Sequence, residues 1–586
     1  MPIIIDQVRI DGFRGLKDFQ MSLSSTTVLT GMNNVGKTSV LKALQLVFGN
    51  SSFLSSEDFH IENNNRTDKI IIDIRIIPTN DDGDRLKDFE DDWIMAFKAD
   101  NIKYDTIEEQ AHLPFRTVIE YDPTKGYFTR ESLILSIWNK DGVDWKNLTT
   151  TKKFVIPYEQ LPFFYIDAHR DILEDIKLKS SYIGKMLNDV SRNYSESQVQ
   201  EIEKLINDLN KKAIDNSEIL SSIQDSLSGL NSAMDSVSST VSITPFTKKI
   251  RDLNKSLSIQ YGSETDTFTM DYHGMGTRSW SSLLTFKAFL NLHLKSLTAG
   301  NVCCPIIAIE EPESHLHPNA QKQLYSQMNE IGGLKIISTH SPYVATCSKL
   351  TELRVLYKKN NNVYAGFFNN TGLHSDEIRQ VERQVICSHG ELLFSKAIVL
   401  FEGETESIAL PLYAEKEFNA PAFKFGVDFV GVGGFGFYAP YVRFASSFGI
   451  PWFIFSDGEQ DAIEGVEKSI KKALNDNSIK AESLDNVFFI PNGGDYETYL
   501  TSLDYLDVFK DAHKKNIEQT ESNYRAIEGK KKKVDTYTLD DYKDKAHKNK
   551  TEWAGIMANA IIDSDKSLPP LITELLNKIK KTLQNE

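Results

Sequence analysis

The sequence lacks a long apolar run. No stretch of about 18 consecutive apolar residues occurs among its 586 residues, and a helix that crosses a membrane needs about that length. The opening residues, MPIIIDQVRIDGF, reach the charged Asp6 after three isoleucines, so they also lack the apolar core of a secretory signal. We therefore expect no membrane partner and a cytoplasmic location.

Cysteine is scarce as well. The sequence has four cysteines, and none of them forms a CxxC pair. This spacing suggests neither a zinc site nor a disulfide framework. We expect reduced and mostly buried thiols at Cys303, Cys304, Cys347 and Cys387.

Basic residues are fewer than acidic residues. The 66 lysines and arginines are outnumbered by 82 aspartates and glutamates, which gives a net charge of −16 and argues against a protein that binds nucleic acid over its whole surface. Lysines nevertheless gather near the C-terminus, where Lys530 to Lys533 form an unbroken run. A solvated helix face and an attraction for phosphate both remain open as interpretations of this run.

The chain is too long for one hydrophobic core, so about three to four domains are expected. Apolar patterning predicts strands at 69–77, 116–121, 130–137 and 153–157. The polar stretch from about 171 to 258 has apolar residues at helical spacing, which predicts long helices that pack on a partner.

Strands that are each followed by a helix return later in the chain, an alternation typical of parallel sheets. They are expected at 305–310, 334–339, 396–401, 426–430, 451–455 and 486–489. The predicted fold class is therefore α/β, and the tail is expected to be helical. The predicted domain ranges are 1–170, 171–258, 259–390, 391–500 and 501–586.

A complete nucleotide-binding motif lies between a predicted strand and a predicted helix. The segment from Gly31 to Thr38, GMNNVGKT, fits GxxxxGK[ST], follows TTVLT and precedes a helical pattern. In this context the loop and the helix N-terminus bind phosphate, Lys37 reaches the outer phosphates and Thr38 ligates Mg²⁺. The predicted ATP-binding residues are Gly31, Asn33, Asn34, Gly36, Lys37, Thr38 and Ser39.

Two acids at the end of an apolar strand predict the catalytic part of this nucleotide site. The segment PIIAIEEPE places Glu310 and Glu311 directly after the strand. Glu310 would hold Mg²⁺, directly or through water, and Glu311 would orient the attacking water. His340 ends the later strand in KIISTH, where it could contact the γ-phosphate, and a purely structural histidine is the alternative.

These motifs resemble those of the ABC ATPases of the RecF/SMC type. VRIDGFRGLKDFQMSL looks like their opening, and EEPESHLHP looks like their Walker B motif and D-loop. The resemblance implies a composite site that a signature loop of a second subunit closes, and therefore a homodimer or a higher homo-oligomer. The segment from Gly274 to Ser279 departs from the usual LSGGQ, and its Gly276 is the candidate that faces ATP.

Acids also follow three of the four strands expected in the second α/β region. Glu402 and Glu406 follow AIVLF, Asp457 and Glu459 follow WFIFS, and Asp495 and Glu497 follow VFFI. Because the carboxyl ends of parallel strands share one edge of a sheet, we expect these side chains to converge. Crowded carboxylates require cations or raised pKa values, and all-oxygen ligands favour Mg²⁺ or Mn²⁺.

This second region resembles a Toprim domain, with an E-G motif at Glu402 and a DxD-like pair in which Glu459 takes the second place. A Toprim domain after an interrupted RecF-like ATPase is the architecture of the OLD (overcoming lysogenization defect) family nucleases, which include the Gabija nuclease subunit and retron-linked effectors. The resemblance implies a helical dimerisation insertion at 171–258. It also implies that Glu402, Glu406 and Asp457 bind metal, with Glu459 and Glu497 supporting a second ion.

The same resemblance implies a lysine near the scissile phosphate, on the C-terminal helices. Lys550 is the match, and Lys545 and Lys548 are alternatives. Such a lysine would stabilise charge in the transition state.

The sequence therefore predicts an ATP-binding endonuclease that cuts DNA with two Mg²⁺ or Mn²⁺ ions. A role in anti-phage defence, with a helicase or a retron reverse transcriptase and its msDNA as partner, is implied by the resemblance. The alternative is a RecF/SMC-like DNA-repair ATPase whose Toprim domain binds a partner without cutting. A topoisomerase or a primase is a weaker prediction, because neither a tyrosine-bearing cleavage domain nor a zinc-binding module is evident.

Overall fold

The computed structural model describes most of the chain as two compact units. The first contains residues Met1–Tyr158 and Leu334–Glu586, and the second contains residues Glu159–Gly333. Within the described residues, no helix has both the length and the apolar character that crossing a membrane requires. The described residues are 2–49, 54–62, 65–80, 83–105, 109–122, 124, 126–139, 144–178, 181, 195–217, 260–262, 267–295, 302–522 and 524–584.

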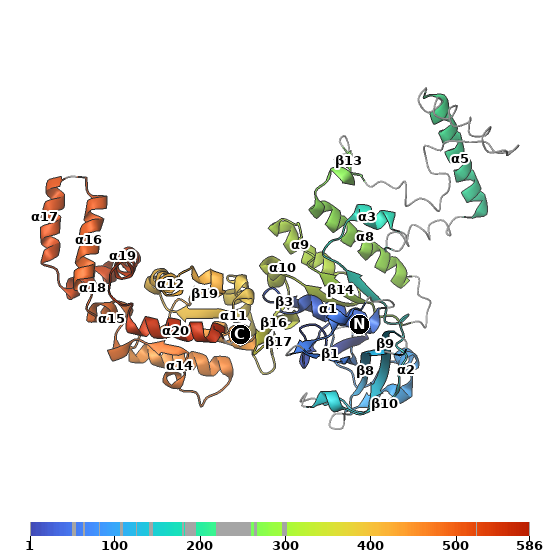
Figure 1. Cartoon of the computed structure of the whole chain (residues 1–586), viewed down its shortest axis with the longest axis horizontal. Helices are drawn as coiled ribbons and strands as arrows, with labels where there is room; N and C mark the ends of the chain where they lie inside the picture. The colour runs from blue at the N-terminus through green and yellow to red at the C-terminus, as the bar shows by residue number, and fades with distance from the viewer. Residues whose placement is uncertain are drawn as a thin grey trace. The chain divides into compact units, whose positions relative to one another are not determined.

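An antiparallel sheet of order β10-β9-β8-β6-β1-β2 begins the first unit, with β7 paired to β8 (Figure 1). Its central strand, β6, has the sequence KIIIDIRIIP and is buried at every position after Lys69, as its β-branched residues favour. The strands are β1 (Ile3–Asp11), β2 (Phe19–Ser22), β6 (Lys69–Pro78), β7 (Lys103–Tyr104), β8 (Ala111–Asp122), β9 (Tyr127–Leu135) and β10 (Thr150–Lys153), with β4 (Ile61–Glu62), β5 (Asn65–Arg66) and α2 (Asp91–Phe97) outside this sheet.

The strand predicted at 153–157 is wrong. β10 ends at Lys153, and its register against β9 shifts between Thr150 and Lys153. The next residues make one backbone hydrogen bond to the sheet, from the Phe154 N–H to the Ser132 carbonyl, and the Tyr158 N–H then donates to the Ile156 carbonyl. Pro157 has no N–H to offer, so the apolar alternation there does not continue the ladder.

A second sheet in the first unit carries the nucleotide motif. β3 (Thr26–Thr30) pairs in parallel with β15 (Leu334–Ser338) and with β16 (Leu353–Lys359), and β16 pairs with β17 (Asn362–Phe367) in an antiparallel hairpin. All five residues of β3 are buried. The helix α1 (Lys37–Phe48) follows β3, and α10 (Pro342–Cys347) follows β15, which confirms the expected βα alternation.

The second unit contains the helical stretch. β11 (Phe163–Ile166) pairs in parallel with β14 (Ile306–Glu310), and β12 (Gln260–Gly262) pairs with β13 (Thr267–Thr269). The helices are α3 (Ile172–Lys177), α5 (Glu196–Asp215), α8 (Met275–Lys295) and α9 (Pro318–Asn329). In the predicted insertion, α5 forms as expected and leaves Leu205 and Leu209 more than half exposed, while 218–258 lie outside the described residues.

A four-stranded parallel sheet of order β19-β18-β20-β21 lies in the later part of the first unit. Each expected strand is found to within one residue. The strands are β18 (Ala397–Phe401), β19 (Val427–Gly431), β20 (Trp452–Ser456) and β21 (Val487–Phe489), and the helices are α11 (Ser375–Val381), α12 (Glu404–Phe418), α13 (Tyr438–Ser447), α14 (Gln460–Leu474) and α15 (Tyr496–Ser502). The α/β fold class is therefore confirmed.

The tail is helical, as expected, and shares its core with this parallel sheet. Trp553 and Met557 of one tail helix and Ile572 of another are buried in one cluster with Val399 of β18 and Phe453 of β20. The tail helices are α16 (Leu506–Thr520), α17 (Tyr524–Asp535), α18 (Leu539–Lys548), α19 (Lys550–Asp563) and α20 (Pro570–Gln584).

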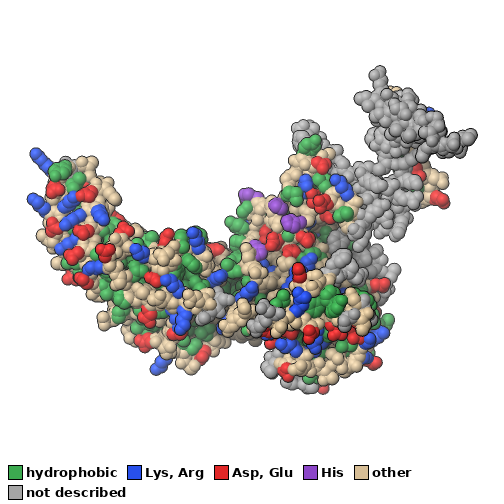
Figure 2. Space-filling model, in the orientation of Figure 1, with side chains coloured by type: hydrophobic (Ala, Val, Ile, Leu, Met, Phe, Trp, Pro, Cys, Tyr) green, Lys and Arg blue, Asp and Glu red, His purple; other side chains and the backbone are tan. Residues whose placement is uncertain are grey.

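The lysine run lies on α17 and is partly neutralised by nearby acids. The Lys530 ammonium is 2.7 Å from the Glu521 carboxylate, and Lys531 forms an ion pair with Glu518. Figure 2 shows basic and acidic side chains interspersed over α16 and α17. This mixture favours the solvated face among the two interpretations of the run.

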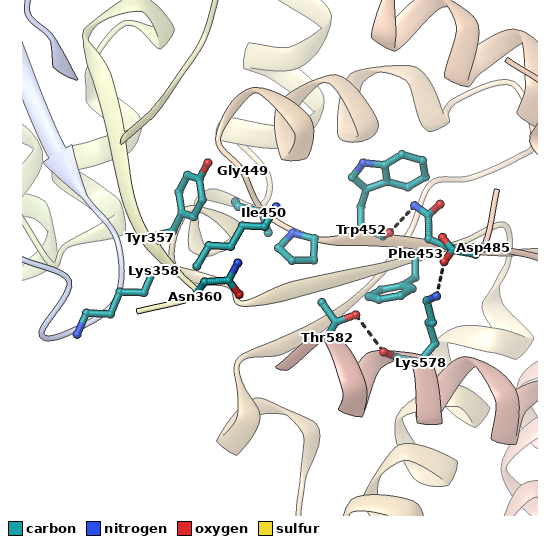
Figure 3. Close-up of a pocket in the computed structure, with 13 residues that line it drawn as sticks. Tyr357, Lys358, Asn360, Gly449, Ile450, Trp452, Phe453, Asp485, Lys578 and Thr582 are labelled. Atoms are coloured by element: carbon teal, nitrogen blue, oxygen red, sulfur yellow. Dashed lines mark hydrogen bonds and ion pairs between the residues drawn. The ribbon is translucent and has the colours of Figure 1, made fainter. Parts of the chain in front are cut away.

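The β16–β17 hairpin meets the parallel sheet at a pocket of about 740 Å³. Figure 3 shows Tyr357, Lys358 and Asn360 on the hairpin side of this pocket. A side chain at Gly449 would collide with the Tyr357 ring, and one at Gly366 would collide with the backbone of Phe448. Two glycines therefore permit this close approach.

Candidate functional site

The predicted phosphate-binding loop is held open by backbone geometry that favours glycine. Gly31 and Gly36 have φ values of 120° and 98°, a region that L side chains rarely adopt. A Cβ at Gly31 would also collide with the Leu356 carbonyl of β16. The loop then leads into α1 at Lys37, which places Thr38 and Ser39 in the first turn. A helix N-terminus behind such a loop binds anions.

Lys37 lies back over this loop. Its ammonium donates to the Gly31 carbonyl at 2.7 Å and to the Met32 carbonyl at 2.8 Å. Asn34 takes the left-handed conformation at φ 62°, a conformation that asparagine tolerates. The side chain that is expected to reach the outer phosphates is thus already at the loop.

His340 follows β15 at the same sheet edge as the loop. The Thr339 N–H donates to the Leu29 carbonyl at 3.0 Å, which ties the end of β15 to the end of β3. Parallel neighbours place their following residues at one edge. His340 is half-buried there, and its contact with a γ-phosphate remains a prediction.

The two predicted catalytic acids of the nucleotide site belong to the second unit. Glu310 is the last residue of β14, is buried, and accepts a hydrogen bond from the Tyr165 hydroxyl. Glu311 follows in a left-handed conformation with φ 40°. The Arg170 guanidinium donates to the Pro312 carbonyl at 2.6 Å and to the Glu310 carbonyl at 3.4 Å, which fixes the turn that carries both acids.

Gly276 lies in the first turn of α8 and packs closely on the segment after Glu313. A Cβ at Gly276 would collide with the His315 carbonyl, so this position requires glycine for packing within the unit. Arg278, two residues later, forms an ion pair with Asp171. The role of Gly276 toward the ATP of a second subunit remains a prediction.

The acids of the second α/β region gather at the carboxyl edge of the parallel sheet. The Ser456 hydroxyl at the end of β20 donates to Glu402 Oε1 at 2.6 Å, and Glu402 directly follows β18. The Thr405 hydroxyl of α12 donates to Glu497 Oε1 at 2.9 Å. These two bonds connect the three strand ends, so the predicted convergence is found.

Burial, reinforced by crowding, raises the pKa of the central carboxyls. Burial, with the charges of Glu497 and Glu402, raises the pKa of Glu406 to about 7, and Lys550 partly opposes this shift. Burial, with the charges of Glu406, Glu402 and Asp495, raises the pKa of Asp457 to about 7. Near neutral pH these two carboxyls therefore exchange between a protonated form and an ionised form that can bind a cation.

Asp457 provides a test of whether divalent ions fit this centre. Its Oδ1 is buried and has no hydrogen-bond partner among the described residues. A buried carboxylate oxygen without a donor is costly in a folded protein, and a metal ion would satisfy it. Oxygen ligands at high negative charge suit Mg²⁺ or Mn²⁺, so the residues fit the ions that the sequence predicts.

The structure distinguishes between the three candidate lysines. Lys550 begins α19, and its ammonium is 3.8 Å from Glu497 Oε1. The Lys545 ammonium lies over the rings of Tyr537 and Trp553, at 5.1 and 5.3 Å from their centroids. The Lys548 side chain is exposed. Lys550 is therefore the lysine with a close contact to the carboxylate centre.

Glu459 occupies a more outward position than the other acids. It is exposed at the start of α14, yet its charge contributes to the raised pKa of Glu402, which burial dominates. The Phe435 N–H also donates to Glu402 and opposes this rise. Glu459 thus lies within electrostatic reach of the centre without being enclosed by it.

Sequence reasoning missed one member of the centre, His547, and placed Asp495 among the converging acids without assigning it a metal ion. Asp495 caps α15 by accepting from the Thr498 N–H at 2.8 Å, and its Oδ2 is 3.4 Å from His547 Nε2. Together with Glu497 they form the one group of three among the described residues whose ligand atoms all lie within 4.8 Å of one another. The trio Glu402, Glu406 and Asp457 is not drawn this tightly together.

Comparisons with known proteins find matches to both the ATPase region and the Toprim region of the chain. The profile described as AAA ATPase domain matches residues 4–345, and the profile described as overcoming lysogenization defect protein-like, TOPRIM domain, matches residues 393–458. The OLD nuclease of Thermus scotoductus is 24% identical over 461 residues, which are 72% of this chain and 75% of that protein. The Old nuclease of Escherichia phage P2 is 23% identical over 433 residues, which are 70% and 69% of the two chains.

A solved structure, the C-terminal region of the Burkholderia pseudomallei OLD protein, is 17% identical and covers 32% of this chain and 99% of its own, with a TM-score of 0.24. So low a score supports no argument about this chain. The ATPase profile, in contrast, spans more than half of the chain. The chain therefore belongs to the AAA ATPase domain family, carries an OLD-like Toprim domain behind its ATPase region, and is homologous to the OLD nucleases.

Proposed function

We propose that this protein is an ATP-binding endonuclease that hydrolyses phosphodiester bonds of DNA with two divalent metal ions. The observation that carries the proposal is the group of acids at the ends of β18, β20 and β21, two of which, Glu406 and Asp457, have a pKa raised to about 7. The names of the relatives, OLD nuclease in Thermus scotoductus and in phage P2, support the same function.

The acids of the sheet edge would hold the two ions. Glu402, Glu406 and Asp457 are the ligands of one ion, and Glu459 and Glu497 support the second. Two such ions activate a water molecule and stabilise the leaving oxygen of the phosphodiester. The hydroxyls of Ser456 and Thr405 hold Glu402 and Glu497 in place, because outer hydrogen bonds orient metal ligands.

Lys550 would stabilise the negative charge that develops on the phosphate. Among the described residues it is the cation in an ion pair with Glu497, at 3.8 Å, and its side chain is half-exposed, so the ammonium can also reach a phosphate outside the carboxylates. A positioned cation acts on the transition state more than on the ground state.

The ATPase half would bind ATP through the loop from Gly31 to Ser39. Glu310 would hold the Mg²⁺ of the nucleotide, Glu311 would orient water, and His340 would contact the γ-phosphate. Gly276 from a second copy of the chain would close the site, which makes the working form a homodimer or a larger homo-oligomer. Anti-phage defence and a helicase or retron partner stay predictions of the family resemblance.

Removal of one metal ligand should abolish cutting while the fold persists. We expect Glu406→Gln to lower the rate of Mn²⁺-dependent plasmid cleavage by about 100-fold or more, since even outer metal contacts are worth about 10- to 100-fold. Glu415→Gln, on the exposed face of the same helix, is the matched control and should cut at the parental rate. Cleavage by Glu406→Gln at that rate would instead favour an ATPase whose Toprim domain only binds a partner.

Substitution of Lys550 should affect stabilisation of the transition state and leave metal binding intact. Lys550→Met should lower kcat for cleavage by about 10²- to 10³-fold without weakening Mn²⁺ binding, because the change removes a cation beside Glu497. Lys548→Met, measured in parallel by gel and by titration of Mn²⁺, should have a much smaller effect. A larger loss in Lys548→Met than in Lys550→Met would assign the role to the other lysine.

Metal binding should be linked to protons near neutral pH. Glu406 and Asp457 keep their protons below a pKa of about 7 and must lose them to bind a cation, so Mn²⁺ affinity should rise from pH 6 to pH 8 and then level off. Calorimetry in two buffers of different ionisation enthalpy measures the released protons, and Asp457→Asn should reduce their number. An affinity that does not change between pH 6 and pH 8 would contradict these pKa values.

A substitution in the predicted nucleotide site should separate ATP binding from ATP hydrolysis. Glu311→Gln should retain ATP but lose about 10²-fold or more of the turnover, because the water loses its orienting base. Rapid filtration with labelled ATP and a phosphate-release assay measure the two properties. Sedimentation of this variant with ATP should show a dimer, and a monomer with full ATPase activity in the parental protein would refute the composite site.

A further inference from the structure

We infer that His547 is a metal ligand, and that with Asp495 and Glu497 it forms a nitrogen-containing position at the Toprim centre that favours a transition-metal ion such as Mn²⁺ over Mg²⁺. The inference deepens the proposed function and rests on it, because it concerns the second ion of the same centre. It adds a residue from α18, outside the part of the chain that matches the Toprim profile.

The geometry of the three side chains matches that of ligands to one ion. Their ligand atoms all lie within 4.8 Å of one another, and His547 Nε2 is 3.4 Å from Asp495 Oδ2. Oxygen and nitrogen ligands lie about 2.0–2.2 Å from small divalent ions, so two ligands of one ion are separated by roughly 3–4 Å. Small side-chain movements are enough to bring the three atoms into this range.

The carboxylates are held in place by bonds that leave oxygens for a cation. Asp495 Oδ1 accepts from the Thr498 N–H, which leaves Oδ2 toward His547. Glu497 Oε1 accepts from the Thr405 hydroxyl. The bonds that orient both carboxylates come from groups that carry no charge, so a bound ion would add to the partial balance that Lys550 gives Glu497 at 3.8 Å, as in a metal site whose outer bonds orient the ligands.

A simple ion pair between Asp495 and His547 does not explain the burial of Glu497. That pair is partly exposed, at 25% and 36% for the two side chains, and such pairs contribute little to stability. Glu497 is only 3% exposed, and Lys550 at 3.8 Å is beyond ordinary hydrogen-bond distance. A buried carboxylate needs a closer cation than this lysine, which a bound ion supplies.

The position also adjoins the rest of the carboxylate centre. The charges of Asp495 and Glu497 are among the causes, after burial, that raise the pKa of Asp457. Asp457 therefore lies within electrostatic range of the ligands of both predicted ions. Imidazole nitrogen is a better ligand for transition metals than for Mg²⁺, which prefers oxygen, so a histidine at the second position biases the centre toward Mn²⁺.

Pulsed EPR of Mn²⁺ bound to the full-length, nucleotide-free protein tests this inference directly. A coordinated imidazole gives ¹⁴N modulation of the Mn²⁺ signal, and we expect this modulation in the parental protein and its loss in His547→Ala. His389→Ala is the matched control, because His389 also lies near a carboxylate, 3.5 Å from Glu391, with 35% of its side chain exposed. The control should keep the modulation.

The affinity for each metal provides the second measurement. His547→Ala should weaken Mn²⁺ binding by about 10-fold or more, whereas Mg²⁺, measured by competition, should change by much less. His547→Gln, which keeps a polar side chain of similar length, guards against a folding defect and should also lose the modulation. Modulation that persists in His547→Ala, or equal losses of both metals, would overturn the inference.

The outcomes separate this inference from the proposed function. Plasmid cleavage by the parental protein in Mg²⁺ without any ¹⁴N modulation in Mn²⁺ would leave the nuclease standing and remove His547 from its ligands. The modulation without cleavage in either metal would leave the histidine ligand standing and remove the nuclease.

Discussion

Repulsion between carboxylates at one edge of the four-stranded parallel sheet is the constraint on which the second half of this structure depends. Two carboxylates about 4 Å apart repel by roughly 4 kcal/mol at an effective dielectric near 20. The fold meets this cost with hydrogen bonds from Ser456 and Thr405 and with Lys550. Burial, together with the remaining repulsion, still raises the pKa of Glu406 and Asp457 to about 7, so the centre keeps an unfavourable negative charge that a cation would offset.

The strand β16 contacts both the predicted phosphate-binding loop and the surroundings of this sheet. The Leu356 carbonyl lies against Gly31 of the phosphate-binding loop, and the neighbouring Tyr357 lies against Gly449, just before β20. β20 in turn ends at Ser456 and delivers Asp457 to the carboxylate edge. A small cavity of about 150 Å³ is lined by the loop and by Ile450 and Pro451. Closely packed elements have low compressibility, so a displacement of the loop would be passed through β16 to the residues that precede β20.

The sequence could predict what is set by local pattern and by parallel topology. The loop from Gly31 to Thr38 and the acids at Glu402 and Asp457 follow apolar strands, so knowledge of each strand end was enough to place them at a sheet edge. The strand expected at 153–157 was wrong, because apolar alternation alone does not show whether a neighbouring strand continues the ladder. His547 could not be predicted. No apolar strand precedes this polar residue to mark its place at the sheet edge, and its partner Asp495 lies 52 positions earlier in the sequence.

The choice among lysines shows why tertiary packing completes the centre. Lys545, His547 and Lys550 are close in sequence, but the bend at Asn549 separates α18 from α19 and directs them differently. Lys545 lies on the Tyr537 and Trp553 rings, where it supports the helical tail, while His547 and Lys550 face Asp495 and Glu497. α19 and α20 share the core of the parallel sheet, and α18 contacts α15, so both sides of this bend are anchored to the Toprim part of the unit. The tail is therefore part of the carboxylate centre, and the segment that carries the strand-end acids is incomplete without it.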